Sequence, residues 1–334
     1  MKDRVAIVGA GVSGLTCGVV FAESGYRTAI FAEETGQRTT SGVAAALWFP
    51  YDAEPAAAVI EWALETYQVL VDLNREPRTG VSMIELCQFS RTGEIQIPDW
   101  AIPLGASAIP MVPSVIPSEV SRCCGITGPQ SELPRTFTSG FAMTVPLMDT
   151  TIYLDYLAKR FLGAGGEIHT GIRFERPEDV NLAFDVVINC TGIGAKNLVH
   201  DEQLEPHRGQ VAIVPKVENL TCAIVCDDPP LMYAIPRANN CVFGGTNEVS
   251  DELDVDPIAT ARILDECSRA LKIEKPDVLS ERVGLRPFRK SGVRLERGCL
   301  RDGRTVVHNY GHGGSGFTLS WGCANAVLEL ASSG

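Results

Sequence analysis

The fold is decided by the stretch Val5-Ala-Ile-Val-Gly9-Ala-Gly11-Val-Ser-Gly14, near the start of the chain. A short apolar run rich in β-branched residues leads into the pattern G-x-G-x-x-G, and residues 15–22 follow with helix-compatible spacing. This order predicts a strand, a tight turn and a helix. In such a unit Gly9 permits the sharp turn, Gly11 lets the backbone approach a pyrophosphate, and Gly14 lets the helix pack closely on the strand. The phosphates would lie at the helix N-terminus, where free N–H groups and the dipole favour negative charge.

The residues that follow this unit favour a dinucleotide site. A second apolar strand, 27–32, ends at Glu33, about 20 residues beyond the last glycine of the pattern. A carboxylate at this place would accept hydrogen bonds from the adenosine ribose hydroxyls and would repel a 2′-phosphate. The alternative interpretation is a glycine-rich turn without a ligand. The motif by itself leaves NAD and FAD open.

Bulk properties exclude several classes of protein. The chain has 334 residues, which favours two domains or one domain with a large insertion. A net charge of −12 argues against nucleic acid and against an anionic membrane surface as partners. No apolar run reaches the roughly 18 residues of a membrane span. The first residues lead into a strand without a signal-peptide pattern, and the last ones are no peroxisomal address, so we expect a cytoplasmic protein.

The cysteines and histidines predict no metal site. Eleven scattered cysteines contain no CxxC pair, and five histidines form no spaced cluster with them. Most cysteines lie in apolar surroundings, which is typical of reduced core residues. Cys123, Cys124, Cys222 and Cys226 are the candidates for a disulfide.

Further along the chain, alternating patterns predict several more elements. Helices are expected over 54–75, 146–162 and 256–271, the last starting near Pro257. Short strands are expected over 81–109, at 184–192, in 207–214 and in a hairpin of 233–237 with 241–246, whereas 103–135 looks irregular. The segment 282–290 is expected to be a loop. Finally, a strand at 305–309, a glycine-rich turn at 310–316 and a helix at 317–330 predict a second anion site at a helix N-terminus.

Five arginines between residues 282 and 297 stand out in an acidic chain. Such a cluster is often a solvated face. The alternative is a carboxylate clamp, because the guanidinium fork matches a carboxylate with two parallel hydrogen bonds.

The whole chain resembles the D-amino-acid oxidase and D-aspartate oxidase family of FAD enzymes. The resemblance covers nearly the full length and rests on motifs in the family's order: VAIVGAGVSGL at 5–15, TTSGVAAALWFPY at 39–51, VINCTG at 187–192, RGQ at 208–210, Y-x-IPR and FGGT within 233–246, GLRPFRKSGVRLE at 284–296, and HNYGHGGSGFTLSWGCA at 308–324. It implies FAD as the cofactor. It also implies an α/β fold in which a Rossmann-type FAD-binding domain (1–52, 145–195 and 282–334) is interleaved with a mixed-sheet α+β substrate-binding domain (53–144 and 196–281).

The resemblance also assigns residues to the cofactor. It places Gly9, Gly11, Val12, Ser13 and Gly14 at the pyrophosphate, Glu33 at the adenosine ribose, and Thr39, Thr40 and Ser41 in the segment that supports the phosphates. It places Ala45, Ala46 and Leu47 against the flavin ring, and Gly313, Gly314, Ser315, Gly316, Phe317 and Thr318 at its pyrimidine end.

The activity implied by the resemblance is oxidative deamination of a D-amino acid. Hydride would pass from the substrate Cα to flavin N5, oxygen would become hydrogen peroxide, and the imino acid would hydrolyse to a 2-oxo acid and ammonia. Arg286 would hold the substrate carboxylate, Tyr233 would assist it, and the carbonyl of Gly314 would accept from the amine. Such catalysis works by orientation and needs no acid or base side chain.

Substrate choice depends on departures from the family pattern. The segment 226–232 looks like a short lid without the second tyrosine of some members, and Ser315 stands where some carry tyrosine. Arg237 is a candidate second cation for D-aspartate, whereas Asp227 and Asp228 would weakly oppose acidic substrates. We therefore expect neutral or apolar D-amino acids. The residues expected to line the side-chain pocket are Phe49, Ile224 and Asn247.

Four other interpretations remain open: a D-aspartate oxidase, a glycine or sarcosine oxidase, an NAD-dependent dehydrogenase, and a dinucleotide-binding redox sensor without catalysis. The expected partners are a small amino acid and O2. The sequence also leaves a homo-oligomer open.

Overall fold

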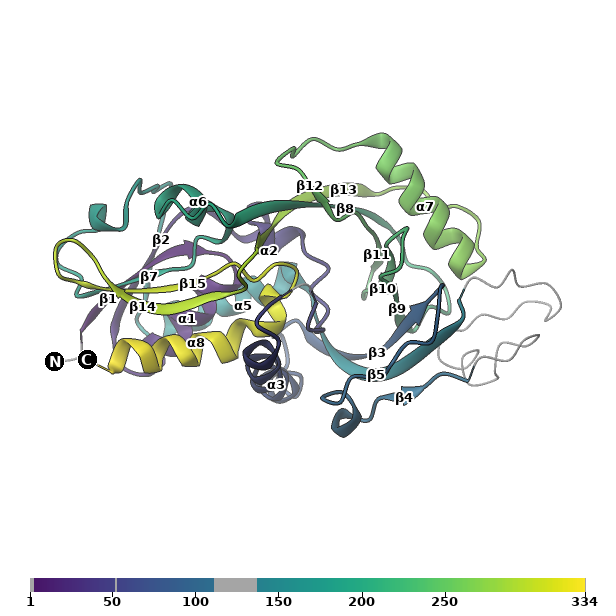
Figure 1. The fold of residues 1–334 in the computed structure, drawn as a ribbon, viewed down its shortest axis with the longest axis horizontal. Coiled ribbons are helices and arrows are strands. Elements are labelled where there is room, and N and C mark those ends of the chain that lie inside the picture. The colour runs from purple at the N-terminus through teal and green to yellow at the C-terminus, as the bar shows by residue number, and fades with distance from the viewer. Residues whose placement is uncertain (1–2, 52, 111–136, 334) are drawn as a thin grey trace.

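The computed structural model describes residues 3–51, 53–110 and 137–333. Two sheets form the two halves of the molecule, which lie side by side along its long axis (Figure 1). Cys123 and Cys124 lie outside the described residues, and Cys222 and Cys226 are both free thiols. No helix in the described ranges is long and apolar enough to cross a membrane.

The first sheet has six strands in the order β14-β15-β7-β1-β2-β6. All neighbours run parallel except β14, which pairs antiparallel with β15 at one edge. Its strands are β1 (Arg4–Ala10), β2 (Arg27–Thr35), β6 (Glu167–Thr170), β7 (Val186–Asn189), β14 (Arg294–Cys299) and β15 (Thr305–Tyr310). The strands β1 and β7 are apolar and buried because helices and loops cover both faces of a parallel sheet.

Helices from distant parts of the sequence pack around α1 beside this sheet. They are α1 (Val12–Glu23), α5 (Thr150–Gly163), α8 (Gly316–Ser332) and, against α8, α3 (Ala56–Leu73). The helix expected over 146–162 begins later, because Pro146 to Met148 still belong to the strand β5. Asp149 then starts α5, and its carboxylate accepts a hydrogen bond from the N–H of Thr151.

The second sheet has nine strands, in the order β12-β8-β11-β10-β9-β3-β5-β4 with β13 on β8. The strands are β3 (Val81–Ser90), β4 (Ser107–Ala108), β5 (Ser139–Met148), β8 (Leu204–Pro215), β9 (Cys222–Cys226), β10 (Met232–Pro236), β11 (Asn240–Gly244), β12 (Glu248–Val249) and β13 (Ser280–Arg289). Helix α7 (Pro257–Leu271) covers its outer face along β8, β10 and β11 (Figure 1). The described residues also form two short helices, α2 (Thr40–Val43) and α6 (Ala195–Leu198).

The segment 282–290, expected as a loop, is instead the strand β13, which pairs with β8 from residue 280 to 289. Gly284 and Pro287 obscure the strand pattern in the sequence, and Pro287 is tolerated because, in the part of the chain that the structure describes, β13 has a partner strand on one side alone. The expected domain boundary at 282 therefore falls inside the second sheet. The chain returns to the first sheet at β14.

The glycine turn is built as the sequence predicts. Gly9 has φ +109°, and a Cβ on it would lie 2.4 Å from the carbonyl oxygen of Cys190. A Cβ on Gly14 would lie 1.9 Å from the carbonyl oxygen of Gly9, so α1 begins directly against the end of β1. Two backbone segments and a helix therefore meet at a place where side chains have no room.

We expect Gly14→Ala to lower the free energy of unfolding by about 3 kcal/mol or more, because the new methyl group meets backbone that cannot move aside. Gly163→Ala is the matched control, since a Cβ there meets nothing within 4 Å and alanine favours the last turn of α5. Denaturant unfolding of both variants measures the difference. Equal stability of the two variants would contradict the close packing.

Candidate active site

A cavity of about 770 Å³ extends from the carboxyl ends of β1 and β7 to the inner face of the second sheet. Open parallel sheets bind ligands at this edge, where loops leave the strands. The glycine turn lies at one end of the cavity, and Tyr233 and Arg286 line the other. Its walls include most of the residues that the sequence assigned to a cofactor: Gly9, Gly11, Val12, Ser13, Glu33, Thr39, Thr40, Ser41, Ala45, Ala46, Leu47, Gly313, Gly314, Gly316 and Phe317.

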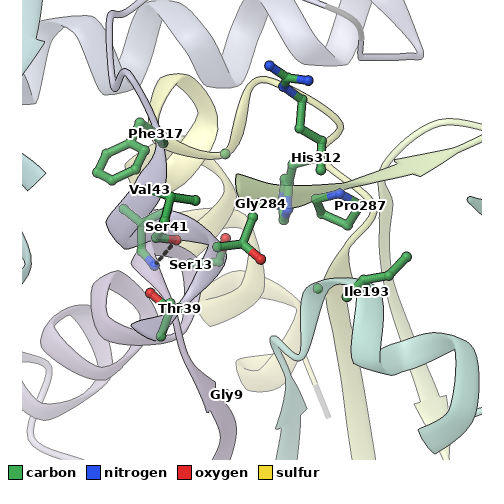
Figure 2. A pocket seen from close by; sticks show the side chains of 18 of the residues that line it. Gly9, Ser13, Thr39, Ser41, Val43, Ile193, Gly284, Pro287, His312 and Phe317 are labelled. Atoms are coloured by element: carbon green, nitrogen blue, oxygen red, sulfur yellow. Dashed lines mark hydrogen bonds between the residues drawn. The ribbon is translucent and has the colours of Figure 1, made fainter. Parts of the chain in front are cut away.

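The start of α1 presents donors to the cavity. Gly11 occupies the N-cap position without a side-chain cap, and the N–H of Val12 donates to Oγ of Ser41 over 2.9 Å. Figure 2 shows Ser13, Thr39 and Ser41 gathered beside this turn. A side chain on Gly11 would crowd Ser41 at 3.1 Å. Bare backbone, hydroxyl groups and a helix N-terminus suit a pyrophosphate.

Glu33 lies in the same wall, near the end of β2. It follows directly on the buried part of β2 and remains largely exposed, with Arg173 3.5 Å from its carboxylate. The acid predicted from spacing therefore lines the cavity and can accept hydrogen bonds from ribose hydroxyls.

A second helix N-terminus opens on the cavity at α8. Gly313, Gly314 and Gly316 line the wall there, whereas Ser315 and Thr318 are buried behind it. The Oγ of Ser315 accepts from the N–H of Tyr51 over 2.7 Å, and Oγ1 of Thr318 accepts from the N–H of Phe49 over 3.1 Å. Their side chains therefore join the segment 49–51 to α8. Gly14 likewise serves packing behind the wall.

The segment 44–47 is held from two sides. Arg237 donates from Nη2 to the carbonyl oxygens of Ala44 and Ala45 over 3.2 and 2.9 Å. On the other side, the N–H of Met148 donates to the carbonyl of Ala46 over 3.0 Å. Arg237 is thus committed to backbone, with a side chain that is 8% exposed and absent from the cavity wall. This corrects its interpretation as a second cation for a substrate.

Arg286 reaches the cavity from β13 and keeps its charge unpaired. Nη1 donates to the carbonyl of Thr246 over 2.8 Å and to Oδ1 of Asn247 over 3.4 Å. Within the described ranges no carboxylate lies in ion-pair distance of it, whereas Arg289 on the same strand is paired with Asp201 at 2.8 Å. Neutral acceptors position a guanidinium without neutralising it, so the remaining donors of Arg286 can bind an anion.

Glycines make room for Arg286 and for the tyrosine beside it. A Cβ on Gly209 of the RGQ motif would lie 2.6 Å from the guanidinium of Arg286. A Cβ on Gly244 or Gly245 would lie 2.1 or 2.8 Å from the ring of Tyr233. Burial raises the pKa of Tyr233, while the charge and the hydrogen bond of Arg286 oppose this rise. The phenol therefore stays protonated and can donate.

Sequence reasoning missed Tyr51. Its hydroxyl accepts from Nδ2 of Asn247 over 3.3 Å, and its ring lies against Gly314, where a Cβ would be 2.7 Å from Cδ1. Although the segment 226–232 has no tyrosine, a second tyrosine does line the cavity, supplied by the end of the motif at 39–51. Asn247 contacts both Tyr51 and Arg286.

The expected side-chain pocket needs two corrections. Asn247 does not line the cavity and instead contacts Tyr51 and Arg286. Phe49 lines the cavity, but Ile224 is buried in the core on the opposite face of the second sheet, and its neighbour Val225 faces the cavity. Every residue of the run CAIVC is apolar and could lie on the core face or on the cavity face of the sheet. The sequence therefore does not decide which of these residues point into the cavity. Gln88 and Asp227 also line the wall, whereas Asp228 binds the N–H of Arg91 and the hydroxyl of Ser90.

His312, one of the histidines that line the wall, is not a ready base or cation. His312 is 4% exposed, and burial lowers its pKa to about 4. One ring nitrogen lies 3.0 Å from Oδ1 of Asn309. At neutral pH its imidazole is neutral and held in place. Figure 2 shows it beside Pro287, which follows Arg286 on β13.

Comparisons with known proteins agree with this geometry. The model of the FAD dependent oxidoreductase family matches residues 4–330. The chain is 38% identical to a D-amino-acid oxidase of Streptomyces coelicolor, over 98% of this chain and 97% of that one. It is 32% identical to a human D-aspartate oxidase, over 98% and 94% of the two chains. Among solved structures, a glycine oxidase from Geobacillus kaustophilus superimposes with a TM-score of 0.78 at 17% identity, covering 99% and 95%.

The fit of the cavity to the cofactor rests on its own residues: bare glycines at the α1 turn, an acid near the end of β2, and a second helix N-terminus at α8. This chain belongs to the FAD-dependent oxidoreductase family that includes the D-amino-acid oxidases, and FAD is its cofactor.

Proposed function

We propose that the enzyme oxidatively deaminates D-amino acids to 2-oxo acids, with release of ammonia and hydrogen peroxide. The observation that carries the proposal is the unpaired guanidinium of Arg286 beside the protonated hydroxyl of Tyr233 in the cavity wall. An amino acid carboxylate would occupy the free donors of Arg286, with Tyr233 as a further donor.

Each residue has a role that orients the substrate. Asn247 and the carbonyl of Thr246 hold Arg286 in place, and the carbonyl of Gly314 accepts from the substrate amine. Bound FAD supplies the acceptor for the hydride that leaves the substrate Cα. The N-terminus of α8 faces the same cavity and favours negative charge there. Fixed donors and acceptors at two ends of a small substrate provide catalysis through orientation.

The substrate side chain is not acidic in this proposal. A D-aspartate oxidase needs a second free cation, but Arg237 is bound to backbone and Asp227 lines the wall. The apolar part of that wall, with Leu86, Val225 and Leu231, suits an aliphatic side-chain stem, which the neutral and apolar D-amino acids expected from the sequence have. We further propose that the first sheet and its helices bind FAD and that the second sheet forms the substrate wall, in a cytoplasmic enzyme without nucleic-acid or membrane partners.

The first test is stereochemical. With D-alanine the purified enzyme should consume O2 and form hydrogen peroxide and pyruvate in equal amounts, and with L-alanine it should do neither. Oxygen uptake, a peroxide assay and pyruvate determination measure these products. Turnover of glycine or sarcosine with no turnover of D-alanine would favour the rival amine oxidases and contradict the proposal.

The second test removes Arg286, the residue proposed to bind the substrate carboxylate. Arg286→Ala should retain FAD and lower kcat/KM for D-alanine by about 100-fold or more, because the carboxylate loses a bidentate charged partner. Tyr233→Phe should lower it by about tenfold, the worth of one hydrogen bond. Arg297→Ala removes the same charge from an exposed arginine outside the cavity wall and serves as the control. Unchanged kinetics in Arg286→Ala would overturn the assignment.

A further inference from the structure

Two polar side chains interrupt the apolar part of the cavity wall. Gln88 on β3 is register neighbour to Val225 on β9, which is in turn neighbour to Tyr233 on β10. Asp227 lies two residues beyond Val225, just after β9, and lines the same cavity. Residues two apart on a strand share a face and are separated by about 6.6 Å. The pair Gln88–Asp227 is therefore on the wall that carries Tyr233, further along it.

Within this pair, the amide of Gln88 is hydrogen-bonded to the carboxylate of Asp227. Nε2 of Gln88 donates to Oδ2 of Asp227 over 2.8 Å, which leaves Oε1 of Gln88 facing away from the carboxylate. Oε1 is buried and has no hydrogen-bond partner, in a side chain that is 4% exposed. A carboxylate can only accept, so it fixes this orientation of the amide. The buried amide thus holds the carboxylate of Asp227, which is the acceptor that the cavity offers.

The charge of Asp227 is also uncompensated. Among the described residues no arginine, lysine or histidine forms an ion pair with it. Arg91 directly follows the neighbouring strand β3. It pairs with Glu266 and donates to the carbonyls of Asp228 and Pro230. Asp227 is open to the cavity, yet the surrounding protein raises its pKa, which the hydrogen bond from Gln88 partly opposes. A cation in the cavity would stabilise the charged carboxylate.

The part of the cavity lined by the second sheet thus has opposite charges and apolar surface. Arg286 supplies the positive charge, Asp227 the negative one, and Leu86, Val225 and Leu231 line the wall as well. An amino acid with the matching order has a carboxylate, an aliphatic stem and a terminal cation. Lysine, ornithine and arginine have this order, and apolar amino acids lack its last part.

We propose that Asp227, held in place by Gln88, binds the terminal ammonium or guanidinium of a basic D-amino acid, which makes basic side chains the preferred substrate class of the site. The inference rests on the proposed function and sharpens it. Asp227 provides the charged acceptor, and the amide of Gln88 holds its carboxylate in place. Neutral D-amino acids with the same stem enter the site but leave the carboxylate of Asp227 without a cation.

D-Lysine and D-norleucine are the matched substrates, because they differ by the terminal ammonium group. The holoenzyme should show at least about a tenfold higher kcat/KM for D-lysine, the effect of one charge-assisted hydrogen bond. Asp227→Asn should lower this ratio by about tenfold. Glu85→Gln removes a like charge from the same sheet without touching the cavity, since Glu85 is not in its wall and precedes Leu86, so it should leave the ratio unchanged.

An equilibrium measurement separates this inference from the proposed function. 6-Aminohexanoate is D-lysine without its α-amine, and hexanoate is D-norleucine without its α-amine. Both can therefore bind without reacting. Calorimetry of the holoenzyme should find 6-aminohexanoate the tighter ligand, and Asp227→Asn should abolish the difference. Equal binding of the two, or a D-lysine to D-norleucine ratio that the variant does not change, would overturn the role of the pair. If no D-amino acid is oxidised while the binding difference persists, the proposed function fails and the cation site stands.

Discussion

The structure depends on one close contact, the packing of the α1 start against the end of β1. Gly14 lies against the carbonyl of Gly9, and Gly9 lies against Cys190 at the end of β7. Since no side chain intervenes, the helix N-terminus points directly into the space beyond the sheet edge. This space is where the motifs at 39–51 and 308–324 also arrive, so a single contact positions the cofactor end of the cavity.

The same device of missing side chains builds the substrate end. Because Gly209 has no side chain, it leaves space for the guanidinium of Arg286. Gly244 and Gly245 likewise leave space for the ring of Tyr233. The three glycines lie on β8 and at the end of β11, far in sequence from Arg286. Two side chains with strong donors are thus seated deep in a sheet, where neutral groups hold them and their hydrogen-bonding capacity stays available to a substrate.

Local signals made the first half of this account predictable from sequence. The turn at Gly9 to Gly14, the acid at Glu33 and the arginine at 286 all lie where the motifs indicated. Properties set by distant pairing were not predictable. The strand β13 depends on β8, about 75 residues earlier in the chain. Which of Ile224 and Val225 faces the cavity depends on the register with β10, and the apolar run fits both choices.

The central claim is that FAD in this cavity accepts electrons from a D-amino acid. An anaerobic absorption spectrum of the purified holoenzyme, recorded before and after addition of D-alanine and then of L-alanine, tests it most directly. The account predicts oxidised flavin bands that bleach with the D-isomer and remain with the L-isomer. Flavin bands that neither D-alanine nor any other D-amino acid bleaches, or a protein that takes up no FAD, would contradict it.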